Sequence, residues 1–165
     1  HTIGETLRAQ PGREIDAALS VADRLRLAEE RIADFEERDR ANAAGNLLDG
    51  AEDIGGAKVA SGRVDGLGGD GVRSLAFQVR DRLGSGVGVF GSVTDGKAAL
   101  IVFASADLVA AGVSAGEIAA TGAKALGGGG SRDPKLAQAG GPNADGMDEA
   151  LDLARSAAQE ALRSL

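Results

Sequence analysis

Residues 87–104 read VGVFGSVTDGKAALIVFA, and this stretch decides the fold class of the chain. Val87, Val89 and Val93 stand at alternating positions, as on one face of a half-buried strand. Asp95-Gly96 supplies a two-residue turn, because a type I′ turn needs positive φ angles at both positions. The apolar run 98–104 then predicts a returning strand that is covered on both faces. The stretch therefore predicts a β-hairpin inside a domain of the α+β or α/β class.

The segments on either side of this hairpin predict the rest of a small mixed sheet with flanking helices. Residues 57–64 look extended, and the run 72–83 carries apolar side chains at helical spacing. A strand–helix–strand unit of this kind places its helix on one face of the sheet. Downstream, Ser105 is expected to cap a short helix, and Ser114 with Glu117 has the spacing of a capping box for a helix that ends near 126. Asp145 is expected to cap a closing helix.

A long helix is predicted before the sheet, from about residue 13 to about residue 44. Its apolar positions alternate spacings of three and four, which is the heptad pattern of a coiled coil. The predicted oligomerisation residues on this seam are Val21, Leu25, Ala28, Ile32 and Phe35. A narrow apolar stripe on a helix is stable when another element packs on it. This element could be a second copy of the chain, another segment of a longer parent chain, or the globular part. We expect two domains, a helical arm over 1–50 and a globular domain over 51–165.

Composition excludes several classes of chemistry. The chain of 165 residues has no cysteine, and its one histidine is His1, so disulfides, cysteine–zinc sites and a Ser-His-Asp triad are not expected. The chain has four phenylalanines and no tryptophan or tyrosine, so few aromatic side chains are available to stack on bases, as single-strand binding proteins require. The net charge of −7 argues against general coating of nucleic acid. No stretch is long and apolar enough for a membrane span, and we expect a cytoplasmic piece of a longer protein.

The second informative stretch is GGGGSRDPKLAQAGG, residues 127–141. Bare backbone N–H groups beside cationic side chains can hold phosphate, whereas the plainer interpretation of a glycine run is a mobile connector. The stretch fits neither a P-loop nor a dinucleotide fingerprint, so no catalytic residues are predicted. No metal-binding residues are predicted either, because cysteine is absent and His1 is the one histidine. The predicted nucleic-acid-binding residues are Lys124, Gly127, Gly128, Gly129, Gly130, Arg132, Lys135 and Gln138.

This stretch resembles the DHH-associated domains found at the C-terminal end of alanyl-tRNA synthetases. The family pattern is a glycine run, an arginine, a short polar step and AQAGG, and Arg132 and residues 137–141 match it in order. The segments 55–66, 80–92 and 95–108, and the helix after Leu7-Arg8-Ala9-Gln10-Pro11, are similar to the same family. The chain departs from the family pattern at two places. The segment 133–136 between the arginine and AQAGG is one residue longer than in the pattern, and Ala120 stands where the family often has a lysine. The role of Lys124, one turn later, is therefore our own inference.

The resemblance implies a module that binds alanine tRNA at its elbow and links the aminoacylation and editing centres of a ligase, with a helical arm that contributes to a homodimer. It implies no cofactor in this chain, since ATP, magnesium and zinc would belong to other parts of the parent. The alternative from a different class is a purely structural coiled-coil oligomerisation module without nucleic-acid binding. A phosphoesterase activity is not expected, because no histidine follows the glycine run.

Overall fold

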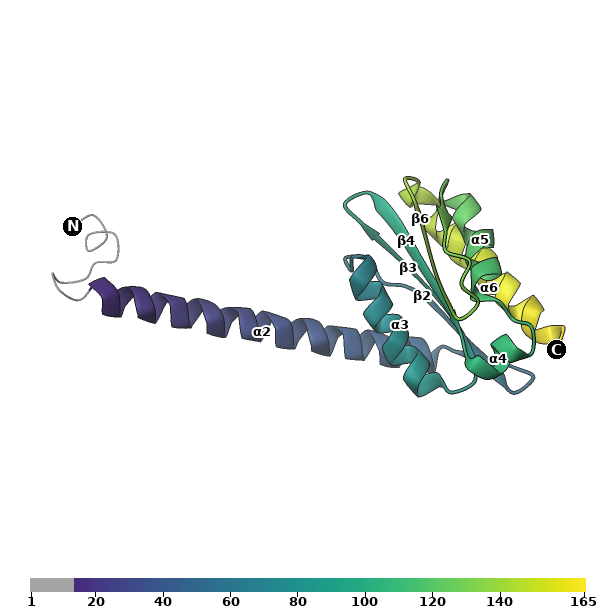
Figure 1. Ribbon diagram of the computed structural model, residues 1–165, viewed down its shortest axis with the longest axis horizontal. Helices are drawn as coiled ribbons and strands as arrows, with labels where there is room; N and C mark the ends of the chain where they lie inside the picture. The colour runs from purple at the N-terminus through teal and green to yellow at the C-terminus, as the bar shows by residue number, and fades with distance from the viewer. Residues whose placement is uncertain (1–13) are drawn as a thin grey trace. The chain divides into compact units, whose positions relative to one another are not determined.

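The computed structural model describes the backbone of residues 14–165 and the side chains of residues 17–165. His1, the apolar segment 1–10 and the predicted helix start at residue 13 lie outside the described residues. The chain divides into two compact units, residues 1–40 and residues 41–165. Helix α2 (Glu14–Asp49) begins in the first unit and ends in the second (Figure 1).

The C-terminal part of α2 belongs to the globular unit. The predicted helix end at residue 44 is too early, because Ala44 is fully buried and Leu47 packs against the same apolar cluster. Burial of these side chains keeps the chain helical through Gly45, which costs roughly 1 kcal/mol relative to alanine in a helix. The units accordingly divide at residue 40, ten positions before the boundary expected at residue 50.

Within residues 14–165 the second unit contains one six-stranded sheet of order β1-β2-β3-β4-β6-β5. Its strands are β1 (Glu52–Ile54), β2 (Ala57–Arg63), β3 (Gly86–Thr94), β4 (Lys97–Ala104), β5 (Gly129–Gly130) and β6 (Leu136–Gly141). Strands β2 and β3 are parallel and the other neighbours are antiparallel. A long helix followed by a small mixed sheet with flanking helices confirms the predicted fold class.

Helices cover both faces of this sheet (Figure 1). Helix α3 (Gly69–Leu83), which connects β2 to β3, packs on the face that carries Phe90, Ile101 and Phe103. Helices α4 (Ala106–Ala110), α5 (Ala115–Ala125) and α6 (Met147–Arg163) belong to the cluster on the opposite face, with Leu100 and Val102. Neighbouring residues of β4 point to opposite faces, so its continuous apolar run fills both cores.

The turn and cap predictions have different outcomes. Asp95 and Gly96 have φ angles of 52° and 74° between β3 and β4, which confirms the predicted hairpin. Ser114 accepts a hydrogen bond from the Glu117 amide at 3.4 Å, which confirms the cap of α5. The Ser105 hydroxyl precedes α4 but makes no cap bond, and it accepts from the Gly86 amide instead. The predicted Asp145 cap is wrong, because this residue lies in the 3-10 turn η1 (Ala144–Gly146) before α6.

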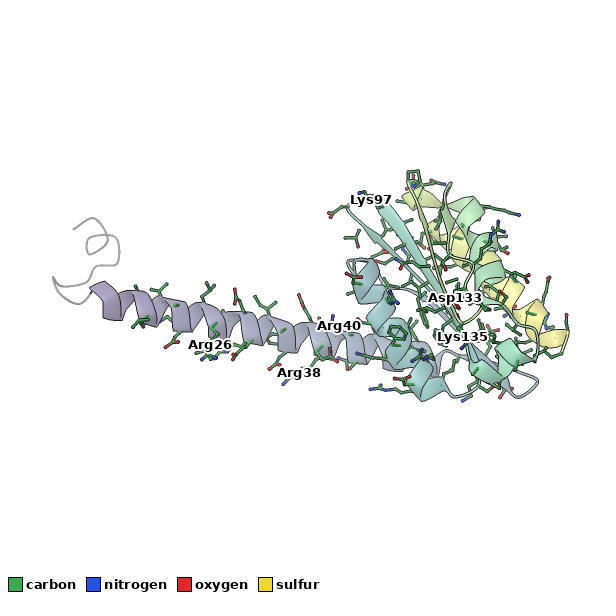
Figure 2. The ribbon with its side chains drawn as sticks, in the orientation of Figure 1. Arg26, Arg38, Arg40, Lys97, Asp133 and Lys135 are labelled. Carbon is green, nitrogen blue, oxygen red and sulfur yellow. The ribbon has the colours of Figure 1, made fainter. Side chains whose placement is uncertain are left out.

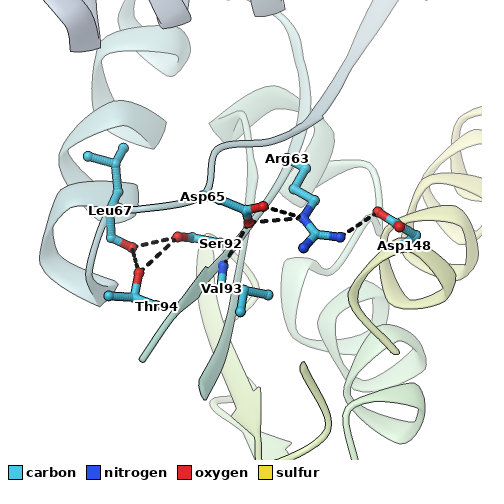
Figure 3. Close-up of polar contacts among 7 residues, drawn as sticks. All are labelled: Arg63, Asp65, Leu67, Ser92, Val93, Thr94 and Asp148. Atoms are coloured by element: carbon cyan, nitrogen blue, oxygen red, sulfur yellow. Dashed lines mark hydrogen bonds and ion pairs between the residues drawn. The ribbon is translucent and has the colours of Figure 1, made fainter. Parts of the chain in front are cut away.

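A polar clamp joins the ends of β2 and β3 to the first turn of α6 (Figure 3). Arg63 donates from Nε to both carboxylate oxygens of Asp65, at 2.9 and 2.8 Å, and from Nη1 to Asp148 at 3.0 Å. The Val93 amide donates to Asp65 at 3.0 Å. These bonds lower the pKa of Asp65, chiefly through Arg63, and raise that of Arg63, chiefly through Asp65 and then Asp148. The clamp thus connects three elements at one end of the sheet.

Candidate nucleic-acid interface

The first part of the glycine stretch ends helix α5. Gly127 has a φ of +68°, its amide donates to the Lys124 carbonyl, and the Gly128 amide donates to the Ala123 carbonyl. This is a Schellman motif, in which the left-handed residue after the helix is usually glycine. Its two amides are already paired, and a helix C-terminus carries partial negative charge that disfavours anions. The expectation of bare donor amides is therefore wrong at Gly127 and Gly128.

The second part of the stretch is a strand rather than a loop. Gly129 and Gly130 form β5, which lies opposite Gly140 and Ala139 of β6, and the Ser131 amide donates to the Gln138 carbonyl at 2.8 Å. Hydrogen-bonded and non-bonded pairs alternate along an antiparallel ladder, so the Gly130 pair is a non-bonded one and its N–H points out of the sheet edge. Pairing with β6 thus takes the place of the open row of backbone donors that the sequence predicts here.

The turn between these strands, hereafter the 131–135 loop, is organised by its own side chains. Ser131 Oγ accepts from the Asp133 amide at 3.2 Å, and Asp133 Oδ1 accepts from the amides of Lys135 and Leu136 at 2.8 and 3.3 Å. These two backbone bonds, with a smaller contribution from the Lys135 charge, lower the pKa of Asp133. The residues that make the step longer than the family pattern therefore form a compact Asx turn.

Helix α5 anchors the 131–135 loop at its N-terminal end. The amide of Ala115, the first residue of the helix, donates to the Pro134 carbonyl at 3.0 Å. A Cβ atom on Gly116 would lie 2.5–2.6 Å from backbone atoms of Arg132, so only glycine admits the loop at this distance. The Arg132 and Lys135 side chains are exposed, and neither forms an ion pair with a described side chain. Two cations are thus held at the surface by a fixed backbone; Figure 2 labels Asp133 and Lys135 of this loop.

The structure does not bring all predicted binding residues together. Lys124 is exposed in the last turn of α5, whereas Arg132 lies against Gly116 in the first turn. Eight helical positions separate these places, about 12 Å along the axis at 1.5 Å per residue. Lys124, Gly127 and Gly128 therefore form one group, and Arg132 and Lys135 form another at the opposite end of the helix.

Gln138 lies near residues that no sequence motif singles out. An ideal Cβ on Gly69, the first residue of α3, would lie 3.0 Å from Gln138 Nε2. Gln138 lines a pocket with Arg73 of α3 and with Ser131 and Asp133 of the loop. The only available signal was the local S-x-D-P turn chemistry around Asp133. Nothing in the sequence indicated that Arg73 would reach a segment some sixty residues away.

The predicted seam on α2 is exposed within the first unit. Val21, Leu25, Ile32 and Phe35 retain 50%, 60%, 57% and 64% of their surface, and Ala28 is exposed as well. Leu19 and Leu27, which stand outside the seam, are also exposed at 61% and 47%. The apolar surface of this helix is therefore broader than a strict heptad stripe.

The described part of the chain lacks two features that would indicate another kind of site. Among these residues no helix is long and apolar enough to cross a membrane. In the same part of the chain, no three histidine, cysteine, aspartate or glutamate residues are grouped so that they could hold a metal ion.

Comparison with known proteins gives a consistent family. The model of the DHHA1 domain matches residues 56–160. Alanine--tRNA ligase of Anaeromyxobacter dehalogenans is 41% identical over 149 residues, which are 86% of this chain and 16% of that protein. The ligase of Acidothermus cellulolyticus is 36% identical over 165 residues, 98% of this chain and 18% of that protein. The chain thus spans less than a fifth of the length of these relatives.

A solved structure shares the fold. The crystal structure of the C-Ala domain from Aquifex aeolicus alanyl-tRNA synthetase has a TM-score of 0.58 and 27% sequence identity, and it covers 66% of this chain and 97% of that chain. The family model spans most of the globular unit, from the β1–β2 turn into α6. The chain therefore belongs to the DHHA1 domain family, and it is similar to the C-Ala domain of alanyl-tRNA synthetase.

Proposed function

We propose that this chain is a tRNA-binding module of an alanyl-tRNA synthetase and that the 131–135 loop is part of its contact surface. The observation that carries the proposal is the pair of exposed cations, Arg132 and Lys135, on a loop fixed to α5 by the Ala115 amide and the close approach at Gly116. Cations on an ordered backbone contact phosphates with little loss of conformational freedom on binding. Lys124, at the other end of α5, is proposed as a separate phosphate contact.

The net negative charge of the chain limits how it can bind RNA. A net charge of −7 disfavours binding to a polyanion in general, so affinity must come from a local group of cations whose position matches the RNA. From the family resemblance we propose that the module contacts the elbow of alanine tRNA. Through this contact the aminoacylation and editing centres of the parent enzyme would act on the same tRNA molecule. Catalysis, and the ATP, magnesium and zinc that it needs, are assigned to other parts of the parent enzyme.

The test is a salt series of alanine-tRNA affinity, measured by fluorescence anisotropy. We expect Arg132→Ala and Lys135→Ala to weaken binding at low salt, and each to reduce the slope of log affinity against log salt by about 0.7–0.9. Lys58→Ala is the matched control, because Lys58 is exposed on β2, which β3 and β4 separate from β6. Affinity and slope that stay at wild-type values in both loop variants would remove the loop from the interface.

A second candidate function, oligomerisation through α2, is favoured by the exposed apolar side chains of its first unit. Side chains such as Phe35, with 64% of its surface accessible, gain free energy when a partner helix covers them. We propose a second copy of the chain as that partner. This function and tRNA binding use different residues and can coexist.

A further inference from the structure

A pocket lies beside the 131–135 loop, on the face of the sheet that α3 covers. It is lined by Arg73 of α3, Ile101 of β4, Ser131 and Asp133 of the loop, and Leu136 and Gln138 of β6. Its volume is about 260 Å³. Pockets for drug-sized ligands begin at roughly 300 Å³, so this one suits a single small ring system.

The inner wall of the pocket is apolar. Ile101 is fully buried in the cluster between α3 and the sheet, and Leu136 is half-buried against the same cluster. At the α3 side, the Arg73 guanidinium lies 5.7 Å from the ring centroid of Phe77, one helical turn away. Unpaired bases stack on apolar side chains and on guanidinium planes of this kind. Leu136 and the Arg73 side chain are thus the lining groups on which a flat ring can pack.

The rim offers hydrogen-bonding groups of both kinds. Asp133 accepts the two backbone bonds of its turn on Oδ1, which leaves Oδ2 without a donor among the described residues. Gln138 and the hydroxyl of Ser131 can both donate, since the Ser131 oxygen is used only as an acceptor in the turn. A ligand that fits must present N–H groups to the carboxylate and an acceptor to its neighbours.

A carboxylate on the rim separates the possible ligands. The backbone bonds of Asp133 lower its pKa, so the group is negatively charged at neutral pH and repels phosphate. Among the bases, guanine presents two adjacent donors, N1–H and the 2-amino group, next to the acceptor O6. The free Oδ2 of Asp133 has two lone pairs and can accept from both of these neighbouring donors, whereas adenine and uracil offer one ring-edge donor each.

We propose that this pocket receives an unpaired guanine base of the bound RNA, with Asp133 accepting from N1–H and the 2-amino group. Gln138 and Ser131 donate to O6, and the ring packs against Leu136 and Arg73, above the fully buried Ile101. The inference rests on the proposed function, because Arg132 and Lys135 bring the RNA backbone to the same loop. It adds recognition of a base to a surface that otherwise contacts phosphates.

The test compares seven-nucleotide single-stranded RNAs that carry guanine, inosine, adenine or uracil between uridines. A bidentate base contact is worth about 1–3 kcal/mol, so the guanine RNA should bind about 5- to 150-fold more tightly than the adenine or uracil RNA. Inosine lacks the 2-amino group and should fall in between. Asp133→Asn keeps an oxygen for the turn but replaces the free acceptor by a donor, so it should abolish the preference for guanine over inosine. A small fall in Tm is expected, because the neutral amide accepts the two backbone bonds more weakly than the carboxylate does.

A second measurement separates this proposal from the proposed function. Guanosine monophosphate should shift the methyl NMR signals of Leu136 in the wild-type chain, and uridine monophosphate should not. Salt-dependent tRNA binding without a guanine preference or methyl shifts overturns the base pocket and leaves the proposed function standing. Methyl shifts with guanosine monophosphate but no affinity for alanine tRNA support the pocket and overturn the proposed function.

Discussion

The backbone of Arg132 lies directly against Gly116: a Cβ atom on Gly116 would fall 2.5 Å from the Arg132 carbonyl carbon. This contact joins the β5–β6 turn to the first turn of α5, next to the bond from the Ala115 amide to the Pro134 carbonyl. The position of the exposed Arg132 side chain is therefore set by a helix on which it does not itself lie. A change at Gly116 should reach the interface without altering any proposed contact residue.

We expect Gly116→Ala to displace the 131–135 loop and weaken alanine-tRNA affinity. The added methyl group meets backbone atoms that cannot rotate away, and overpacking of this kind costs about 1–3 kcal/mol of unfolding free energy. Gly45→Ala is the matched control, because Gly45 also lies in a helix and has open space around its Cβ position. The control should raise Tm slightly and leave affinity unchanged. Thermal unfolding and anisotropy give both readouts.

A second pair of variants tests the β5–β6 ladder. A Cβ on Gly128 would lie 1.8 Å from the Gly140 carbonyl oxygen, whereas a Cβ on Gly129 meets nothing within 4 Å. We expect Gly128→Ala to lower Tm by several degrees and to increase hydrogen exchange at the Ser131 amide, because β5 must move away from β6. Gly129→Ala, at the next residue, should do neither. Equal behaviour of the two variants would mean that the strand pairing is not what orders this segment.

These two strands are also where prediction from the sequence failed. The 95–96 turn and the apolar run of β4 are local signals, and the structure contains both. Four of the six residues of strand β6 are alanine or glycine, such as Ala137 and Ala139, which have little intrinsic preference for a strand. They are buried because they pair with Val102 and Leu100 of the neighbouring strand β4. This pairing is non-local, so it cannot be predicted from the sequence of residues 136–141 alone.

The candidate site could be predicted only in part for the same reason. The stretch itself predicts Arg132 and Lys135, because a cation beside a glycine run can be recognised without long-range information. These two residues are separated from Lys124 because the loop packs on the first turn of α5 and Lys124 lies in the last turn, which depends on tertiary contacts. The pocket partner Arg73 depends on the packing of α3 across the sheet.

The clamp around Arg63 predicts a specific dependence of stability on pH. The folded pKa of Asp65 is lowered, so its stabilising effect is present at neutral pH and is lost as the pH falls through that folded pKa. We expect Asp65→Asn to lower Tm at pH 7 and the difference from wild type to shrink below about pH 4. Asp152→Asn is the control, since Asp152 is exposed on α6 and in no ion pair with a described residue. A constant difference at all pH values would contradict this account.

The proposed dimer is tested best by two neighbouring residues of α2. Ile32 is on the apolar seam and 57% exposed, while Ala33 is exposed one position outside it. Ile32→Asp places a charge in the centre of a helix–helix contact, where its desolvation has no compensating partner. Ala33→Asp adds the same charge on a solvated face. Sedimentation velocity at several concentrations should show a dimer for wild type and Ala33→Asp and a monomer for Ile32→Asp. A wild-type chain that stays monomeric up to about 100 μM, where most two-copy contacts of micromolar Kd are filled, would leave the exposed side chains of α2 to a different partner.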